Sequence, residues 1–341
     1  MVMSENKLNN FNSFPSFSII IETENLVSAE LEGLFQCLDS LASQTLSLEF
    51  ANEVLIIESG DVPNEIIENI SSKYLWLSFH TIEAGSDYYT AKMKGASLTT
   101  GEIIVFCDSD CTYDKHWLQS ILTPFFENSE IKVVAGETVT PIDTIYDIAI
   151  ALTYIFPRFS NSKSIYQSSN IYMNNVAFKQ NLLIQFPMPS GVNIYRGNCV
   201  LYTRSLCRQG YKIWKQPQAK ATHAVPNGKS FFFWRFLLLG NDAFTIYKID
   251  RNFSQQKSKY VNLIQDLVFL LLIFLSKIKE LFNRCFTIAS EDIRYLIYLP
   301  LSLPIVILSL FLFFIGLAFA YLKPSYLLRL YDQSTAKHQA S

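Results

Sequence analysis

The feature that most restricts the fold is a run of 28 residues without a charged side chain, from Tyr295 to Leu322. About 20 apolar residues are enough for a helix to cross the hydrocarbon core of a bilayer. Tyrosines lie at both ends of the run, where membrane helices collect aromatic side chains, and Pro300 and Pro304 fall near one end. The sequence therefore predicts a transmembrane helix over residues 295–322. A buried helix of a soluble protein is the alternative.

The residues before this run are also rich in apolar side chains. Leu267–Leu275 is apolar for nine residues, between Asp266 and Lys277. Such a segment is too short for a clear span, so residues 261–277 are either the first helix of a transmembrane hairpin or an interfacial helix. Residues 229–260 place aromatic side chains beside Arg235. This predicts an amphipathic helix resting on the membrane surface, with a core helix under a sheet as the alternative.

An apolar strand that runs into two carboxylates is the segment best suited to chemistry. Ile103–Phe106 is continuously apolar and β-branched for most of its length, as in strands buried on both faces of a parallel sheet. Asp108 and Asp110 follow, and residues two apart in a strand point to the same side. Two such carboxylates suit Mg²⁺ or Mn²⁺ with substrate phosphate oxygens completing the shell. An acidic turn that caps the next helix is the alternative.

The preceding segments predict a parallel α/β sheet. An apolar strand over residues 17–25 is followed by a helical stretch at 34–44 and a second strand at 53–61. A further helix signal at 91–96 leads into the strand that ends at Asp108. Strand, helix and strand in this order are typical of a βαβ unit. Ligands of open α/β sheets bind where such strands end.

The order of these pieces resembles the family 2 glycosyltransferases, which have the GT-A fold. The residues that carry the resemblance are Cys37–Gln44, Glu53–Glu58, Ala91–Gly95, Asp108–Asp110, Trp117–Leu122 and Val133–Gly136. The resemblance covers roughly residues 16–240. It implies a GT-A type nucleotide-diphospho-sugar transferase domain at 16–228, with a mostly parallel sheet flanked by helices. The regions at 229–260 and 261–325 would follow it, before a tail at 326–341.

The resemblance also implies a metal site and a nucleotide-sugar site. Asp110 would be the direct ligand of a divalent cation, Mn²⁺ or Mg²⁺, and Asp108 would lie nearer the ribose and the water shell of the metal. His223 would lie against the metal or the diphosphate, where a neutral imidazole coordinates Mn²⁺, unless it is a structural histidine. The residues implied to bind the nucleotide sugar are Glu22, Thr23, Glu58, Lys92 and Asp108.

Some of these positions depart from the usual family pattern. Glu58 stands where the family more often has Asp, so the base that the site prefers is less certain. Lys92 stands where many members have Arg, and it would pair with phosphate as a point charge or be an exposed helix lysine. Met93 replaces a frequent Asn, which removes a polar contact.

The largest departure concerns the general base. Gly197 and Asn198 occupy the place of the Glu-Asp pair that normally deprotonates the acceptor hydroxyl, and an Asn amide does not titrate near neutral pH. Three explanations remain: another acid supplies the base, an acceptor that is already ionised needs none, or the chain has lost transferase activity. Glu137, Asp143 and Asp242 are the candidate substitutes.

Together these features predict a membrane-anchored, metal-dependent and inverting glycosyltransferase. It would move a sugar from a nucleotide-diphosphate donor to a hydroxyl of a glycan or lipid-linked acceptor, in polysaccharide or glycoconjugate synthesis. A catalytically silent scaffold that binds nucleotide sugar or glycan is the second hypothesis. A lipid-modifying enzyme without a nucleotide would leave the carboxylates at the strand ends without a shared purpose. The sequence contains no Gln-x-x-Arg-Trp string, so a processive polysaccharide synthase is not favoured.

Composition and the two ends of the sequence bear on the partners and the cellular location of the protein. The net charge of −2 gives no footprint for nucleic acid, and no Gly-rich phosphate loop supports NAD or ATP chemistry. No signal sequence precedes Phe17, so the catalytic domain is expected in the cytoplasm, on an inner or plasma membrane. The six cysteines are expected to be reduced and mostly buried. Residues 1–15 and the tail from about Gln333 are expected to be disordered.

Overall fold

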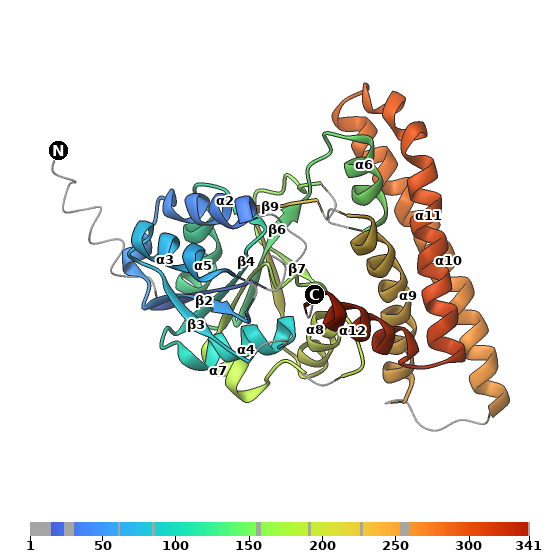
Figure 1. Ribbon diagram of the computed structural model, residues 1–341, viewed down its shortest axis with the longest axis horizontal. Helices are drawn as coiled ribbons and strands as arrows, with labels where there is room; N and C mark the ends of the chain where they lie inside the picture. The colour runs from blue at the N-terminus through green and yellow to red at the C-terminus, as the bar shows by residue number, and fades with distance from the viewer. Residues whose placement is uncertain are drawn as a thin grey trace. The chain divides into compact units, whose positions relative to one another are not determined.

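The structure is a computed structural model that describes residues 15–23, 31–60, 62–83, 86–154, 158–189, 192–225, 228–252 and 259–339 (Figure 1). The chain divides into two compact units. The first comprises Met1–Val139, Phe159–Gly191 and Asn198–Ala224, and the second comprises Thr140–Arg158, Val192–Gly197 and Val225–Ser341. Residues 1–14 of the segment expected to be disordered lie outside the described residues.

A nine-stranded mixed sheet forms the centre of the first unit, in the order β3-β2-β1-β4-β8-β6-β9-β5, with β7 paired to β9. Strands β3, β2, β1 and β4 are parallel neighbours, as the βαβ pattern predicts, whereas β8 runs antiparallel to both β4 and β6. The strands are β1 Phe17–Glu22, β2 Glu53–Glu58, β3 Ser78–Thr81, β4 Ile103–Asp108, β5 Cys111–Tyr113, β6 Val133–Val139, β7 Tyr166–Ser168, β8 Asn175–Lys179 and β9 Ile213–His223.

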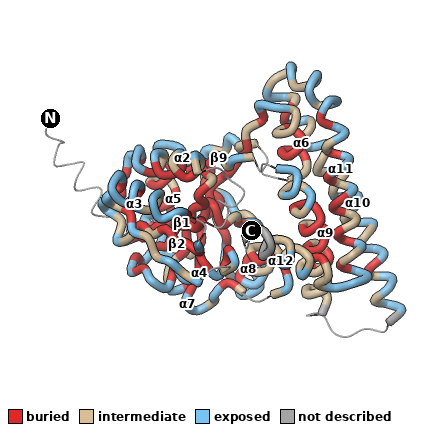
Figure 2. Tube along the Cα trace, in the orientation of Figure 1, coloured by how far each residue is buried: buried red, intermediate tan, exposed pale blue. Residues whose placement is uncertain are grey.

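Two apolar cores cover the two faces of this sheet, and its central strands are coloured as buried in Figure 2. Alternate residues of β4 enter different cores: Val105 packs in one, and Ile104 and Phe106 pack in the other. All six residues of β4 are buried, which confirms the prediction of a strand covered on both faces. The helices of this unit are α2 Leu31–Ala42, α3 Asn64–Lys73, α4 Tyr88–Leu98, α5 Trp117–Glu127, α7 Gln180–Gln185 and α8 Asn198–Arg208, with a short 3₁₀ helix η2 Leu48–Phe50.

The predicted α/β class with flanking helices is therefore confirmed, with a sheet that is parallel on one side and mixed on the other. The six cysteines are free thiols, but only Cys37, Cys107 and Cys111 are fully buried. Cys207 is exposed, so the expectation of mostly buried thiols holds for half of them.

A glycine in β6 allows the strands to approach closely beside the sheet irregularity between Gly136 and Glu137. A Cβ atom on Gly136 would lie 2.2 Å from the Ala219 carbonyl oxygen and 2.3 Å from Asn175 Oδ1. The Asn175 amide donates to the carbonyls of Glu137 and Ala219, at 3.0 Å each. The missing side chain therefore keeps this buried hydrogen-bond bridge in place.

Gly136→Ala is expected to lower the free energy of unfolding by about 2–3 kcal/mol, because the methyl group displaces the Asn175 amide from its partners. Gly33→Ala is the matched control: nothing lies within 4 Å of a Cβ at that helical position. It should stabilise the protein by about 0.5–1 kcal/mol. Thermal unfolding of the full chain in detergent measures both changes, and an unchanged melting temperature for Gly136→Ala would contradict the packing described.

The second unit is helical in its described part, with α6 Ile145–Thr153, α9 Lys229–Asn252, α10 Lys259–Glu291, α11 Tyr295–Leu322 and α12 Tyr326–Gln339. Two of its helices are long and apolar enough to cross a membrane, by length and composition: Tyr260–Glu291 and Tyr295–Leu322, with mean hydropathy of 2.0 and 2.7 over their most apolar windows. The apolar face of α10 is largely exposed, and α11 is partly buried. Both are therefore candidate membrane spans.

The structure refines three expectations in this unit. The short run Leu267–Leu275 is part of a 33-residue helix, because helical geometry continues through the charged residues that follow it. α9 packs along α11 and buries Phe236 and Leu238, so it forms part of a helical core whether or not it also touches a bilayer. The expectation of disorder from Gln333 is wrong as far as Gln339, since α12 extends to that residue and packs on α9 and α11.

Candidate active site

The carboxyl ends of β1, β2 and β4 bring the predicted residues to one edge of the sheet. Glu22 lies opposite Asp108 in the register of β1 and β4. Thr23 donates its hydroxyl to the Ile57 carbonyl at 3.3 Å. The Glu58 carboxylate accepts the N–H groups of the turn that follows β2, including Val62 at 3.3 Å. Parallel pairing is the cause of this gathering, because it aligns the strand ends.

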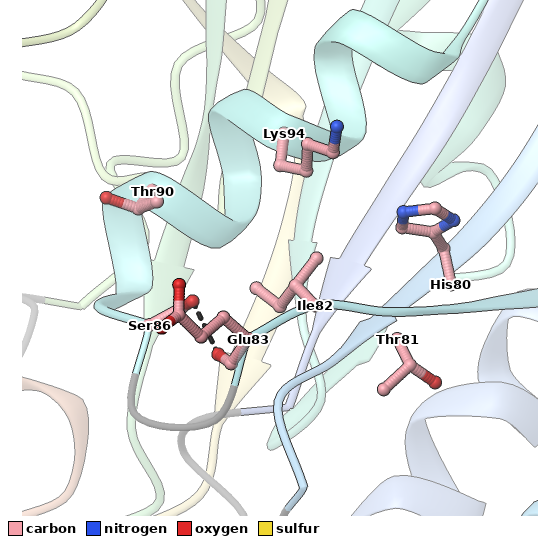
Figure 3. Close-up of a pocket in the computed structure, with 7 residues that line it drawn as sticks. All are labelled: His80, Thr81, Ile82, Glu83, Ser86, Thr90 and Lys94. Atoms are coloured by element: carbon pink, nitrogen blue, oxygen red, sulfur yellow. Dashed lines mark hydrogen bonds between the residues drawn. The ribbon is translucent and has the colours of Figure 1, made fainter.

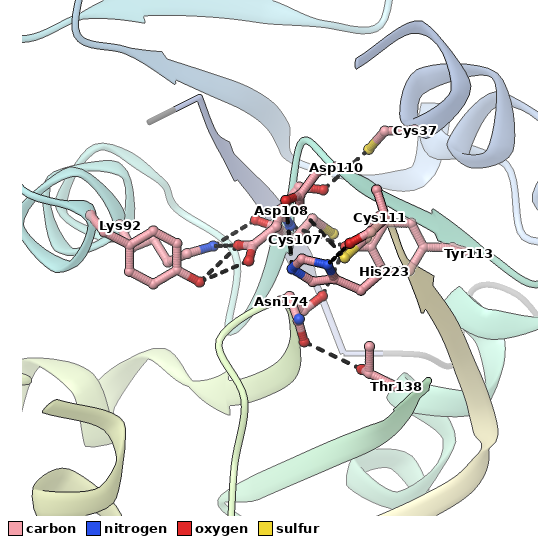
Figure 4. Close-up of polar contacts among 12 residues, drawn as sticks. Cys37, Lys92, Cys107, Asp108, Asp110, Cys111, Tyr113, Thr138, Asn174 and His223 are labelled. Carbon is pink, nitrogen blue, oxygen red and sulfur yellow. Dashed lines mark hydrogen bonds and ion pairs between the residues drawn. The ribbon is translucent and has the colours of Figure 1, made fainter. Parts of the chain in front are cut away.

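Asp108 is held by a buried cation and a phenol from α4 (Figure 4). Lys92 Nζ lies 2.7 Å from Asp108 Oδ1 and also donates to the Cys107 carbonyl at 2.6 Å. The Tyr88 hydroxyl lies 2.8 and 3.0 Å from the two oxygens of the same carboxylate. Because the Lys92 side chain is 0% exposed, the alternative of an exposed helix lysine is wrong. Its pairing with phosphate stays a prediction.

Asp110 faces His223 across the pairing of β5 with β9. Cys111 lies opposite His223 in this antiparallel register, so the two side chains lie on the same face. His223 Nε2 lies 3.5 Å from Asp110 Oδ2, and His223 Nδ1 lies 2.6 Å from the Ala224 carbonyl oxygen. A carbonyl only accepts, so Nδ1 carries a proton, and Nε2 is the ring nitrogen that faces the carboxylate.

Asp110, Cys111 and His223 offer ligand atoms that lie within 4.8 Å of one another. A carboxylate oxygen and an imidazole nitrogen suit Mn²⁺, whereas a soft thiolate prefers zinc. Burial raises the pKa of the Cys111 thiol well above its ordinary range, and the charge of Asp110 adds to this. The donor set that fits a hard divalent cation is therefore Asp110 with His223.

The candidates for a general base occupy structural positions. Glu137 is buried and accepts the Ser160 N–H at 2.9 Å and the Tyr166 hydroxyl at 3.1 Å. Asp242 accepts three backbone N–H groups of residues 195–197, and burial raises its pKa to about 6. Asp143 is exposed. The hydrogen bonds of Glu137 and Asp242 explain their burial without a catalytic role.

Three residues of the site were not predicted: Tyr88, Cys111 and Tyr113. Tyr113 accepts the Asp108 N–H at 3.1 Å and donates to the Asn174 carbonyl at 2.8 Å. Tyr88 precedes Lys92 by one helical turn, and residues at this spacing share a helix face. That spacing was the available signal for Tyr88. Cys111 and Tyr113 depend on the pairing of β5 with β9, which the sequence does not display.

An open pocket of about 240 Å³ lies at the end of β3, the first strand in the sheet order (Figure 3). His80 and Glu83 line it from the strand end and the loop that follows, and Thr90 and Lys94 line it from α4. None of the residues predicted for the nucleotide or metal lines this pocket. It is therefore separate from the carboxylates at the ends of β1, β2 and β4.

Comparison with known proteins identifies similar chains. Glycosyltransferase AglE of Haloferax volcanii is 24% identical over 208 residues, which cover 59% of this chain and 64% of AglE. Polypeptide N-acetylgalactosaminyltransferase 11 of Xenopus tropicalis is 29% identical over 140 residues, which cover 38% of this chain and 22% of that protein. The chain thus spans about two thirds or less of the length of these relatives.

A solved structure supports the same fold. The crystal structure of GalNAc-T7 with UDP, GalNAc and Mn²⁺ has a TM-score of 0.51 and 12% identity, covering 62% of this chain and 44% of GalNAc-T7. At this identity the likeness concerns the fold alone, which is of the predicted GT-A type. The model of the family described as glycosyl transferase family 2 matches residues 18–209. Since this match covers more than half of the sequence, the protein belongs to glycosyl transferase family 2.

Proposed function

We propose that this protein transfers a sugar from a nucleotide-diphosphate donor to a hydroxyl of a glycan or lipid-linked acceptor at a membrane, in polysaccharide or glycoconjugate synthesis. The observation that carries the proposal is the placement of Asp110 with His223 beside Asp108, at the carboxyl end of a central parallel strand. Such strand ends are where open α/β sheets bind ligands. Membership of family 2 supports the same reaction class.

The strand ends would divide the recognition of the donor. The base and the ribose of the donor carry N–H and hydroxyl groups that need hydrogen-bond acceptors. The side chains that would supply these acceptors are Glu22, Thr23 and Glu58. The Asp108 carboxylate would accept a hydrogen bond from a ribose hydroxyl. Lys92 and Tyr88 hold this carboxylate in position. Because Lys92 balances the charge of Asp108, its contribution to the diphosphate would be long-range attraction.

Asp110 and His223 would hold Mn²⁺ or Mg²⁺. When bound, the cation neutralises charge on the diphosphate as it leaves the sugar. The chain's part is to fix the two donors: the Ala224 N–H donates to the Asp110 carbonyl at 2.9 Å, and the Ala224 carbonyl orients the imidazole. The Mn²⁺ in the GalNAc-T7 crystal structure supports this assignment by similarity of fold.

Inversion at the anomeric carbon is the expected outcome of the reaction. It needs an acceptor oxygen in line with the leaving diphosphate and a group that takes its proton, unless that oxygen is already ionised. Glu137 and Asp242 both serve in hydrogen bonds that hold the fold. An acceptor that arrives ionised, or an acid supplied with the acceptor, would meet this need.

Titration of UDP and GDP into the detergent-solubilised chain, with Mn²⁺ and with EDTA, tests the proposal. We expect one nucleotide to bind at least 10-fold more tightly with Mn²⁺, and its sugar conjugates to be hydrolysed slowly in the absence of acceptor. Equal binding with EDTA would contradict the metal site. Failure of both nucleotides to bind would contradict the proposed donor class.

The second candidate function is a silent scaffold that binds nucleotide sugar or glycan. The replacement of the usual Glu-Asp pair by Gly197 and Asn198 favours it, since Asn198 is buried and donates its amide to the Pro189 carbonyl at 2.8 Å. Metal-dependent nucleotide binding without donor hydrolysis, and without transfer to any extracted lipid or glycan fraction, would favour the scaffold over the transferase.

We also propose that the first unit lies in the cytoplasm and that the apolar helices α10 and α11 attach the chain to the membrane from the same side. Glu291 at the end of α10 pairs with Arg158 at 2.8 Å, and Arg158 directly precedes Phe159 of the first unit. Ile293, which lies between the two helices and is 71% exposed, is therefore expected on the cytoplasmic side.

Ile293→Cys and the native chain, whose exposed Cys207 lies in the first unit, should both react with a membrane-impermeant maleimide only after permeabilisation. Labelling of Ile293→Cys in intact cells would show instead that α10 and α11 cross the membrane as a hairpin, and labelling of the native chain in intact cells would reverse the orientation.

A further inference from the structure

In the part of the chain that the structure describes, Arg235 is a buried cation without an acidic partner. Its side chain belongs to α9 in the second unit, is 7% exposed, and has a buried Nε with no hydrogen-bond acceptor. Within the described residues, no carboxylate pairs with it. Burying an arginine in this way is costly unless something compensates for its lost hydration. The side chains around Arg235 must therefore offset part of the free-energy cost of burying its charge.

Three aromatic rings surround the guanidinium group and define the Arg235 cage. The guanidinium carbon lies 4.4 Å from the ring centre of Phe231, 5.0 Å from that of Tyr195 and 5.4 Å from that of Tyr154. Ring faces attract a cation by their quadrupole. They accept no conventional hydrogen bond, however, so the N–H groups at the edge of the guanidinium fork still need oxygen acceptors.

The cage is a supported structure. Asp242 accepts the N–H groups of Tyr195 and Arg196 at 2.8 Å and of Gly197 at 3.1 Å, which fixes the loop that carries the Tyr195 ring. The Tyr195 ring also packs edge-on against Tyr331 of α12, with ring centres 5.1 Å apart. The buried carboxylate of Asp242 thus serves the loop, and among the described residues it forms no ion pair with Arg235.

The cage lies beside a candidate membrane span. Two residues beyond Arg235, the Leu237 carbonyl oxygen lies only 1.9 Å from the place of a Cβ on Gly316, so α9 and α11 touch backbone to backbone there. Gly316 precedes the end of α11 at Leu322 by six residues, which is about 9 Å of helix. The cage therefore lies near the C-terminal end of α11, and the ends of an apolar membrane helix are where lipid headgroups meet water.

We propose that the Arg235 cage binds the phosphate group of a lipid-linked acceptor. A planar guanidinium fork matches two phosphate oxygens, and a charge-assisted pair of this kind is strongest where water is excluded. The lipid chain would lie along the apolar helices of the same unit. The inference rests on the proposed transfer to a membrane acceptor and names its chemical class. Free phosphate and the diphosphate of the donor are the other sources of the same chemistry.

Binding of farnesyl phosphate and farnesol to the full chain in detergent tests the proposal, with calorimetry as the readout. We expect the phosphate to bind at least 10-fold more tightly than the alcohol. Arg235→Gln should abolish this preference without changing the affinity for UDP or GDP. Arg294→Gln is the matched control, because Arg294 lies in the same unit with a side chain that is 82% exposed. It should retain the full preference.

The remaining outcomes separate the alternatives. An unchanged preference in Arg235→Gln would overturn the proposal, as would competition by inorganic phosphate at concentrations equal to those of farnesyl phosphate. Loss of nucleotide affinity in Arg235→Gln would assign the residue to the donor instead. If Arg235→Gln does not fold, Arg235→Lys tests the proposal, because it keeps the charge in the cage but loses the guanidinium fork. The preference for farnesyl phosphate over farnesol should then fall at least fivefold. A preference equal to that of the native chain would contradict phosphate recognition by Arg235. Nucleotide binding tests the proposed function independently of these results.

Discussion

Replacing Asp110 with alanine is expected to remove the Mn²⁺ dependence of nucleotide binding and to lower sugar transfer by about 10³-fold. The side chain is the carboxylate donor of the candidate metal site, 3.5 Å from His223 Nε2. Without it, a single imidazole would face a cation that prefers oxygen ligands. The loss of charge neutralisation on the leaving diphosphate is worth several kcal/mol in comparable metal-assisted reactions. Calorimetry with UDP or GDP measures the binding, and release of the nucleotide measures transfer.

The loop after β5 offers a matched control for this variant. Asp114 is an exposed aspartate four residues beyond Asp110, and its side chain takes no part in the site described. Asp114→Ala should therefore retain binding and transfer within about twofold. If Asp110→Ala bound nucleotide with an unchanged response to Mn²⁺, the cation would have to be held elsewhere, and the proposed roles of Asp110 and His223 would fail together.

The half of the sheet that carries Glu22, Glu58 and Asp108 could be predicted because its signals are local. β1, β2 and β4 are continuous apolar runs that end in polar residues, and the helices between them leave parallel pairing as the simple solution. The same pattern places Glu22 and Asp108 at one edge, since register follows from the aligned strands. The prediction of these positions therefore needed no knowledge of side-chain contacts.

The other half of the sheet depends on pairing between distant segments. β8 enters antiparallel between β4 and β6, and nothing in its five residues indicates which neighbours it chooses. The placement of Cys111 opposite His223 likewise joins residues more than a hundred positions apart. Such contacts are set by the fit of whole elements, so single-sequence patterns do not contain them.

The state of Lys92 was missed for a related reason. A lysine on a helix is usually exposed, and its burial follows from a carboxylate supplied by a different element. The extent of α12 was missed because its sequence is polar overall, with a helix stabilised by packing of Leu327 rather than by its own propensity. In both cases tertiary contacts outweighed the local pattern.

Lys92→Met is expected to lower the free energy of unfolding by about 3–5 kcal/mol. The substitution keeps most of the side-chain volume but leaves Asp108, which is 4% exposed, without its buried cation. Breaking one half of a buried ion pair costs this much because the remaining charge has neither water nor a partner. Part of the cost also comes from the Cys107 carbonyl, which loses its donor. Thermal unfolding of the full chain in detergent measures the change.

Two further variants separate the buried pair from a general effect of losing a lysine. Lys94→Met removes an exposed charge two residues away on α4 and should change the free energy of unfolding by less than about 0.5 kcal/mol. Lys92→Met combined with Asp108→Asn removes both charges, so it should be more stable than Lys92→Met alone, with Tyr88 still able to donate to the amide oxygen. A double variant as unstable as the sum of the two single variants would mean that the charges of Lys92 and Asp108 do not compensate each other, and that Asp108 is held at the strand end by Tyr88 and the sheet alone.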